Sequence, residues 1–359
     1  MSKTAYLVLE NGKIFKGKSF GAEKEVISEI VFTTGMTGYL ETLTDKSYYG
    51  QAAVQTFPLI GNYGVIPQDF ESDGVYMDAY ICKNVCDVPS NFRSTGALDE
   101  FLKRKGVPGL YDIDTRALTK IIRESGVMNG MLTYDLSHVD PDRIKAYKVE
   151  RAVESVSTKK PYIVKGEGRY RIALYDFGLK ENIVRYLVQC GCDVYVYPYN
   201  TKVEKIMECQ PNGIVLSNGP GDPAENVGVI AELKKLPELK IPVLGICLGH
   251  QLIALAHGFK TEKLKYGHRG ANQPVKDTET GRVYITSQNH GYAVVGDSVD
   301  PKIAEQFFVN VNDGTCEGLK YFNEDTVTAQ FHPEACGGPH DTNCIFDRFV
   351  ASMEERICR

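Results

Sequence analysis

The segment Gly245-Ile246-Cys247-Leu248-Gly249 places a cysteine between two glycines, directly after an apolar run that begins at Pro242. The apolar run predicts a buried strand, and residues Gln251 to Ala256 have the pattern of a helix. A cysteine with a glycine two residues to either side, at a turn from strand to helix, is typical of a nucleophile elbow. The positive end of the helix favours the thiolate form of the cysteine. The segment therefore predicts covalent catalysis on a carbonyl carbon by Cys247.

A cysteine nucleophile needs a base, and the candidate is His332 in the segment Gln330 to Glu334. Pro333 favours an extended conformation for the residue before it, and alternate residues of an extended segment share a face. We therefore expect His332 to lie beside Glu334, whose carboxylate would orient the imidazole and stabilise the imidazolium. Without the cysteine segment, the same residues would be interpreted as a surface turn.

An oxyanion hole requires backbone N–H groups that point at one position. The N–H of Leu248 is one candidate. The turn Gly219-Pro220-Gly221 is expected to supply the second, because glycines let the backbone approach a ligand closely. An ordinary turn is the alternative interpretation, and a phosphate-binding loop is a weaker one because no Walker lysine follows.

A further polar cluster, Asn289-His290-Gly291-Tyr292, suits hydrogen bonding to a small polar substrate, although a loop is the simpler prediction for it. Metal binding has little support. Cys336, His340 and Cys344 are each four residues apart, but no fourth ligand is evident, and we expect no metal site.

The composition disfavours several classes of protein. A chain of 359 residues predicts two domains, and 43% hydrophobic with 24% charged residues is ordinary for a soluble globular protein. The net charge of −5 gives no reason to expect nucleic acid or an anionic membrane as partner. No stretch approaches the ~20 apolar residues of a membrane span, and no secretory signal is visible. The 10 scattered cysteines favour reduced thiols and a cytoplasmic location.

The elements that must position these residues fall into two regions. Residues 1–150 predict a mixed α+β domain, with a hairpin turn at Asn11-Gly12 and a helix from Asp114 to Glu124. Residues 151–169 are rich in Ser, Thr, Lys and Gly and predict a linker.

Residues 170–359 predict strands that alternate with helices, which indicates a doubly wound, mostly parallel sheet. The expected strands are Ile172–Tyr175, Val194–Tyr197, Gly213–Leu216 and Val243–Ile246. Val283–Thr286 is also expected to be a strand, and the Asn289 cluster follows it. Active sites of such sheets lie beyond the carboxyl ends of the strands, where Gly219 and Cys247 are expected.

Three segments, in chain order, resemble those of the class I (triad) glutamine amidotransferases: Ser217 to Gly221, Gly245 to Gln251 and His332 to Glu334. The N-terminal region resembles the small subunits of carbamoyl-phosphate synthases in Gly38-Tyr39, Leu43 to Tyr48, Pro58 to Gly64 and Asp112 to Leu118. Asn289 to Tyr292 and Gly338 to Asp341 extend this resemblance over essentially the whole chain. Cys336-Gly337 departs from the family, which more often carries Ser or Pro there.

The resemblance implies a role for each matching residue. Cys247 would be the nucleophile, His332 the base and acid, and Glu334 the orienting group, with oxyanion amides from Gly219 and Leu248. The glutamine site would be lined by Ser47, Gly219, Gly221, Leu248, Gln251, Asn289, Gly291 and Tyr292. Because Ser47 lies in the N-terminal region, the resemblance also implies a glutamine site near a domain interface.

The family further implies that the ammonia released from L-glutamine passes to a large synthetase subunit, which makes carbamoyl phosphate from bicarbonate and ATP. We therefore expect no cofactor in this chain, with ATP and Mg²⁺ on the partner. Three alternatives remain: an amidotransferase subunit for another acceptor, a regulatory subunit with a degenerate site, and a free-standing cysteine hydrolase. The N-terminal segments disfavour the first and third, and the presence of Cys247, His332 and Glu334 disfavours the second.

Overall fold

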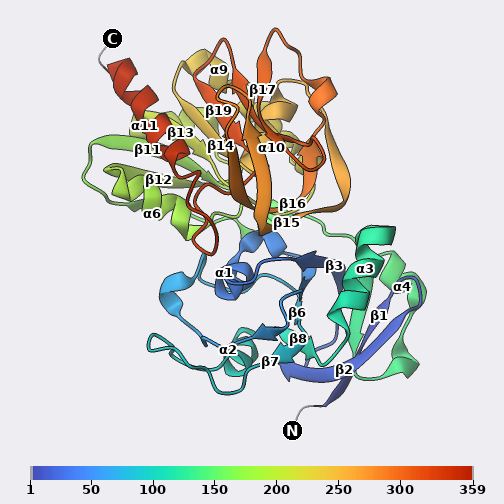
Figure 1. The fold of residues 1–359 in the computed structure, drawn as a ribbon. Helices are drawn as coiled ribbons and strands as arrows, with labels where there is room; N and C mark the ends of the chain where they lie inside the picture. The colour runs from blue at the N-terminus through green and yellow to red at the C-terminus, as the bar shows by residue number, and fades with distance from the viewer. Residues whose placement is uncertain (1–2, 358–359) are drawn as a thin grey trace. The chain divides into compact units, whose positions relative to one another are not determined.

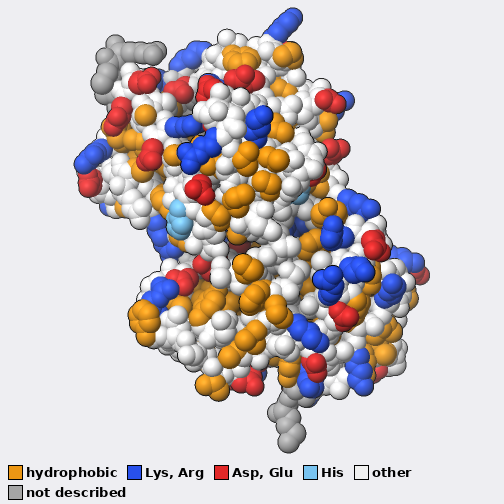
Figure 2. Space-filling model, in the orientation of Figure 1, with side chains coloured by type: hydrophobic (Ala, Val, Ile, Leu, Met, Phe, Trp, Pro, Cys, Tyr) orange, Lys and Arg blue, Asp and Glu red, His pale blue; other side chains and the backbone are white. Residues whose placement is uncertain are grey.

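The computed structural model describes residues 3–357 of the chain. The chain divides into two compact units, Met1–Glu150 and Arg151–Arg359 (Figure 1). Among the described residues no helix is both long enough and apolar enough to cross a membrane. On the face drawn in Figure 2, acidic and basic side chains are interspersed, so that face carries no extended patch of one sign.

The first unit is built around a closed barrel of seven strands in the order β1-β2-β8-β6-β4-β3-β9. These strands are β1 (Thr4–Leu9), β2 (Ile14–Gly21), β3 (Val26–Thr33), β4 (Gln51–Gln55), β6 (Ala79–Ile81), β8 (Pro108–Tyr111) and β9 (Met128–Thr133). A separate pair joins β5 (Leu59–Ile60) to β7 (Asn84–Val85). The helices are α1 (Tyr39–Thr44), α2 (Leu98–Lys105), α3 (Thr115–Ser125) and α4 (Pro141–Lys145), with short 3₁₀ helices η1 (Lys46–Tyr48), η2 (Pro67–Asp69) and η3 (Leu136–His138).

Two local predictions for this unit are confirmed. Strands β1 and β2 form an antiparallel hairpin around Asn11-Gly12. Asp114 caps the start of helix α3, and its carboxylate accepts a hydrogen bond from Ala117 N at 2.9 Å; Gly126 directly follows the last residue of the helix. The closure of the strands into a barrel was not predicted, because it depends on pairings such as β2 with β8 that join residues far apart in the sequence.

The second unit contains one ten-stranded sheet, in the order β10-β12-β11-β13-β14-β19-β18-β16-β15-β17. The strands are β10 (Tyr162–Val164), β11 (Tyr170–Asp176), β12 (Cys192–Pro198), β13 (Gly213–Leu216), β14 (Val243–Ile246), β15 (Thr261–Asp277), β16 (Val283–Val294), β17 (Ala304–Asn310), β18 (Cys316–Tyr321) and β19 (Thr326–Ala329). The helices are α5 (Ala152–Val156), α6 (Glu181–Gln189), α7 (Val203–Ile206), α8 (Val227–Leu233), α9 (Leu236–Leu239), α10 (Leu248–Ala256) and α11 (Cys344–Ile357), and the 3₁₀ helices are η4 (Met207–Cys209), η5 (Pro223–Glu225) and η6 (Gly296–Ser298).

Only half of this sheet is parallel, so the prediction of a mostly parallel sheet needs correction. Strands β12, β11, β13, β14 and β19 run parallel to one another. Strands β15 to β18 pair antiparallel, and β18 joins antiparallel to β19. Short connections link β15 to β16 and β17 to β18, and such connections can join only antiparallel neighbours.

Helices cover both faces of the parallel half, as a doubly wound sheet requires. One apolar cluster includes residues of α8 and α10, such as Leu233 and Leu252, packed against β11 and β13. A second cluster includes residues of α6 and α11, such as Leu187 and Phe346, on the opposite face. Burial on both faces explains why these strands are almost entirely apolar in sequence.

The predicted linker, residues 151–169, is instead part of the second unit. Helix α5 buries Ala152, Val153 and Val156, and β10 pairs antiparallel with β12. The polar composition was misleading because some polar groups in this stretch serve as hydrogen-bond partners. Ser157 Oγ, for example, accepts from Tyr199 N at 3.0 Å.

Candidate active site

The three predicted segments follow three neighbouring strands of the parallel sheet. Strand β13 pairs with β14, and β14 pairs with β19. Gly219 follows β13, Cys247 follows β14 and His332 follows β19. Parallel neighbours end at the same edge, so the sheet brings these residues together at its carboxyl end.

Cys247 occupies a strained turn between β14 and α10. Its backbone has φ 53° and ψ −102°, a conformation that residues other than glycine rarely adopt. A Cβ on Gly249 would lie 2.4 Å from the carbonyl oxygen of Leu216, so only glycine lets the helix approach β13 this closely. Helix α10 begins at Leu248, three residues before the predicted start. Cys247 is therefore the residue that precedes the helix, at the positive end of the helix dipole.

His332 and Glu334 form a buried pair. His332 Nδ1 lies 2.7 Å from Glu334 Oε1, and neither side chain is exposed. The local conformation differs from the extended segment that was predicted: Ala335 N donates to His332 O at 3.3 Å, so the two side chains meet across a turn. His332 Nε2 is also buried and has no hydrogen-bond partner among the described residues. That nitrogen is the one left to exchange a proton with a substrate.

The surroundings of His332 favour its charged form. Burial and the nearby Lys180 ammonium lower the pKa of His332, but Glu334 and Cys247 raise it by more, to about 10. For Glu334 burial acts upward, and the His332 cation brings the pKa of the carboxyl below its usual range. The effect of Cys247 on the pKa of His332 places the sulfur near the imidazole.

The two candidate oxyanion donors lie against each other. A Cβ on Gly219 would lie 2.3 Å from Phe177 O and 2.8 Å from Leu248 Cδ2, which places the glycine backbone beside the first residue of α10. The N–H of Leu248 is in the first helical turn, where N–H groups have no partner within the helix. Gly221 has φ +88° and turns the chain away after the Gly219 segment. Two backbone N–H groups close to a buried cysteine are suited to stabilise an oxyanion.

Comparison with known proteins agrees with this geometry. Residues 7–132 match the family described as "Carbamoyl-phosphate synthase small chain, CPSase domain", and residues 173–352 match "Glutamine amidotransferase class-I". A carbamoyl phosphate synthase small chain of Clostridium perfringens is 49% identical over 96% of this chain and 98% of the relative. Proteins of the same name from Fusobacterium nucleatum and Bacillus caldolyticus are each 48% identical, the first over 98% of both chains and the second over 97% and 96%.

The chain belongs to the carbamoyl-phosphate synthase small chain family. The two family matches lie within the two structural units, since residues 7–132 fall in the first and residues 173–352 in the second. In this family member, the class I amidotransferase region therefore includes the strand ends that carry Gly219, Cys247 and His332.

The segment Asn289 to Tyr292 lies inside β16, so the prediction of a loop there was wrong. Asn289 pairs with Arg269 of β15, and the register of this ladder shifts on either side of the pair. Asn289 O lies 3.8 Å from Cys247 Sγ, which places this part of β16 beside the nucleophile. The polar residues suggested a loop, but the strand carries them because it faces a polar site.

Gln251 is held by hydrogen bonds to β16 and to the segment that follows β19. Its Nε2 donates to Tyr292 O at 2.7 Å and to Gln330 Oε1 at 2.9 Å. Ser47 lies in the first unit, in η1, where its N–H donates to Asp45 Oδ1 at 2.8 Å. The glutamine-binding roles of Ser47, Gly291 and the other residues implied by the resemblance stay predictions.

Sequence reasoning missed Lys180. Its Nζ lies 3.7 Å from Glu334 Oε1, and the side chain is only 9% exposed. The lysine follows β11, which is the next strand after β13 in the sheet. The position of Lys180 after a strand could be predicted from the sequence, but its contact with Glu334 depends on the order of the strands.

Proposed function

We propose that this chain is the glutaminase subunit of a carbamoyl-phosphate synthase, which hydrolyses L-glutamine to glutamate and ammonia. The observation that carries the proposal is the position of Cys247 on a strained turn before α10, beside the buried His332–Glu334 pair. A cysteine with a charged imidazole beside it and backbone N–H groups nearby is equipped for acyl transfer.

In the first half of the proposed reaction, the Cys247 thiolate attacks the carboxamide carbon of glutamine. The carbonyl oxygen becomes an oxyanion, which the N–H groups of Leu248 and Gly219 stabilise. Loss of one such donor typically costs about 3 kcal/mol of transition-state stabilisation. His332 then gives the proton on Nε2 to the leaving nitrogen, the C–N bond of the tetrahedral intermediate breaks, and ammonia departs, which leaves a thioester on Cys247.

In the second half, His332 changes from acid to base. Formation of the thioester removes the negative charge of the sulfur, which is one of the groups that raise the pKa of His332. The pKa of His332 therefore falls as the acyl-enzyme forms, and this fall favours release of the proton. The neutral imidazole that remains has a free Nε2 lone pair and can accept a proton from the attacking water. The activated water attacks the thioester, the C–S bond breaks, and glutamate leaves with Cys247 regenerated.

The proposed partner is the large subunit of the synthase. Ammonium ion is not a nucleophile, so ammonia must reach its acceptor before bulk water protonates it. The chemistry of bicarbonate and ATP, with Mg²⁺, is assigned to that partner, and the cysteine mechanism requires no cofactor in this chain. The nine described cysteines are free, which supports the proposal of a cytoplasmic location.

The test is glutamate release by the purified chain, alone and with a carbamoyl-phosphate synthase large subunit, compared with Cys247→Ser. Activity that increases with the partner and is lost in the variant is the expected result. The complex with Cys247→Ser should still make carbamoyl phosphate from added ammonia. Equal glutaminase activity in both proteins would exclude the mechanism, and no activity in the wild-type complex would favour a regulatory subunit.

A further inference from the structure

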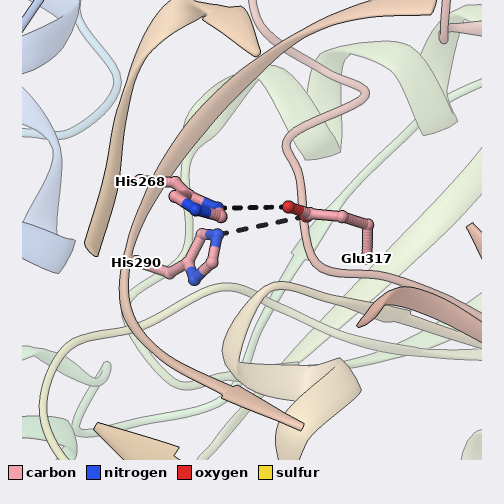
Figure 3. A group of neighbouring side chains, drawn as sticks. All are labelled: His268, His290 and Glu317. Atoms are coloured by element: carbon pink, nitrogen blue, oxygen red, sulfur yellow. Dashed lines mark hydrogen bonds and ion pairs between the residues drawn. The ribbon is translucent and has the colours of Figure 1, made fainter. Parts of the chain in front are cut away.

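A second group of titratable side chains lies behind the Asn289–Tyr292 segment. His268 on β15 and His290 on β16 face each other across the strand pair, and both imidazoles point toward the carboxylate of Glu317 on β18 (Figure 3). His268 Nδ1 lies 3.2 Å from Glu317 Oε1. His290 Nε2 lies 3.1 Å from Gln288 Oε1, and the carboxylate of Glu317 is next to it, with Oε2 4.0 Å away. Glu317 is fully buried. A buried carboxylate destabilises the fold unless cations or hydrogen-bond donors surround it.

Hydrogen bonds from the ring N–H groups of His268 explain the arrangement of these side chains better than a bound metal ion does. His268 Nε2 lies 2.8 Å from Asp313 Oδ2, so both ring nitrogens of His268 face a carboxylate oxygen. Burial raises the pKa of Glu317, and His268 acts against this rise. With both carboxylates ionised they can only accept, and each nitrogen of His268 then carries a hydrogen. Burial lowers the pKa of His268, but the two carboxylates raise it by more, above its usual range. An imidazolium has no lone pair for a metal, although the three side chains are close enough to hold one.

His290 connects this group to the candidate active site. Its Nδ1 donates to Tyr292 O at 2.8 Å, and the same carbonyl oxygen accepts from Gln251 Nε2 of α10. On the other side of His290, Asn289 O lies 3.8 Å from Cys247 Sγ. The ring of His290 stands edge-on to that of His268, with centroids 5.0 Å apart. A shift of His290 would therefore move the backbone on both sides of it, next to the nucleophile.

We propose that Glu317 and His268 are positioning residues that hold His290, and through it the Asn289–Tyr292 segment, in the geometry that binds glutamine. This inference rests on the proposed glutaminase function. In this proposal neither residue contacts the substrate. Asn310 Nδ2 donates to Glu317 Oε1 at 2.9 Å and fixes the carboxylate from the adjoining strand, while Asp313 fixes His268 from the other side.

The competing explanation is that the group only stabilises the fold, and a matched control separates the two. His257 and Glu324 form another histidine–carboxylate pair, partly buried, with Nε2 and Oε1 2.5 Å apart, at the C-terminal end of α10. We would compare Glu317→Ala, Glu317→Gln and the control Glu324→Ala, each in the complex with the large subunit, with melting temperature measured in parallel.

The expected result is a rise of about tenfold in the KM for glutamine in Glu317→Ala, with kcat within about threefold, because the defect is in substrate placement. Glu317→Gln keeps an acceptor of the same shape for His268 and is expected to recover most of the loss. Glu324→Ala is expected to lower the melting temperature without raising KM.

A chemical probe gives a second readout. Alkylation of Cys247 by a glutamine-shaped diazoketone should slow in Glu317→Ala, while alkylation by iodoacetamide, which needs no glutamine site, should not. An unchanged KM in Glu317→Ala, an equal rise in Glu324→Ala, or equal slowing of both reagents would overturn the inference. A wild-type complex without glutaminase activity would instead refute the proposed function.

Discussion

His332 Nδ1 lies 2.7 Å from Glu334 Oε1 at a site where neither side chain is exposed, while His332 Nε2 is left without a hydrogen-bond partner among the described residues. One nitrogen of the ring is therefore committed to the carboxylate and the other is available for chemistry. The hydrogen bond to Glu334 fixes the orientation of the imidazole, and the negative charge of the carboxylate favours the imidazolium form.

Glu334→Gln is expected to keep the orientation of His332 and to remove the charge that favours its cation. The thiolate–imidazolium pair should become less populated near neutral pH, because Glu334 is among the groups that raise the pKa of His332. We expect kcat/KM for glutamine to fall by about tenfold or more. The rate of iodoacetamide alkylation of Cys247 at pH 7 should fall as well. An unchanged alkylation rate would show that Glu334 does not set the charge of the pair.

The candidate site was largely predictable because its residues follow strands that the sequence marks clearly. Val243–Ile246 and Gly213–Leu216 are apolar runs of the lengths observed, and each ends at a glycine-containing turn. Parallel strands bring such turns to one edge regardless of the rest of the fold. The roles of Cys247 and His332 could therefore be proposed before the order of the strands was known.

Other features could not be predicted, since they depend on which distant segments pair. The closed barrel joins β2 to β8, about ninety residues apart in sequence, and no local pattern encodes that pairing. The polar residues of β16 suggested a loop until their pairing with β15 placed them beside Cys247. The contact of Lys180 with Glu334 likewise depends on the order of β11, β13, β14 and β19 in the sheet.

Cys247→Gly is expected to yield an inactive protein that is more stable than Cys247→Ala. The backbone at this position has φ 53° and ψ −102°, and such strain costs on the order of 1–3 kcal/mol for a residue with a Cβ. Glycine relieves the strain but loses about 0.5–1 kcal/mol to chain entropy. We therefore expect the free energy of unfolding, measured in urea, to be about 1 kcal/mol higher for the Gly variant than for the Ala variant. Equal stabilities would argue that the turn is not strained.

Gly249→Ala is expected to impair both stability and catalysis. The added Cβ would lie 2.4 Å from Leu216 O, so α10 would have to move away from β13 and carry the Leu248 N–H with it. Overpacking of this kind typically costs about 1–3 kcal/mol. Gly228→Ala is the control, because the added Cβ at this exposed position in α8 meets nothing within 4 Å. Thermal melting and glutaminase assays of both variants would test the prediction, and similar effects at the two positions would contradict it.

The His257–Glu324 pair is expected to make folding stability depend on pH. His257 Nδ1 lies 2.9 Å from Ile253 O and Nε2 lies 2.5 Å from Glu324 Oε1, so both nitrogens face oxygen acceptors. Burial lowers the pKa of His257, but these acceptors raise it by more, above the ordinary value of 6.5. The stabilisation is therefore fully present below pH ~6.5 and is lost as the pH rises through the folded-state pKa. It amounts to about 1.4 kcal/mol for each unit between the unfolded-state and folded-state pKa values.

The measurement is urea unfolding of wild type and His257→Gln from pH 6 to pH 9, in which the stability advantage of wild type should shrink as the pH rises. His138→Gln serves as control, because His138 is exposed and its contact with Asp135 is 3.5 Å long. A wild-type advantage that stays constant across this range would show that the pair contributes packing alone.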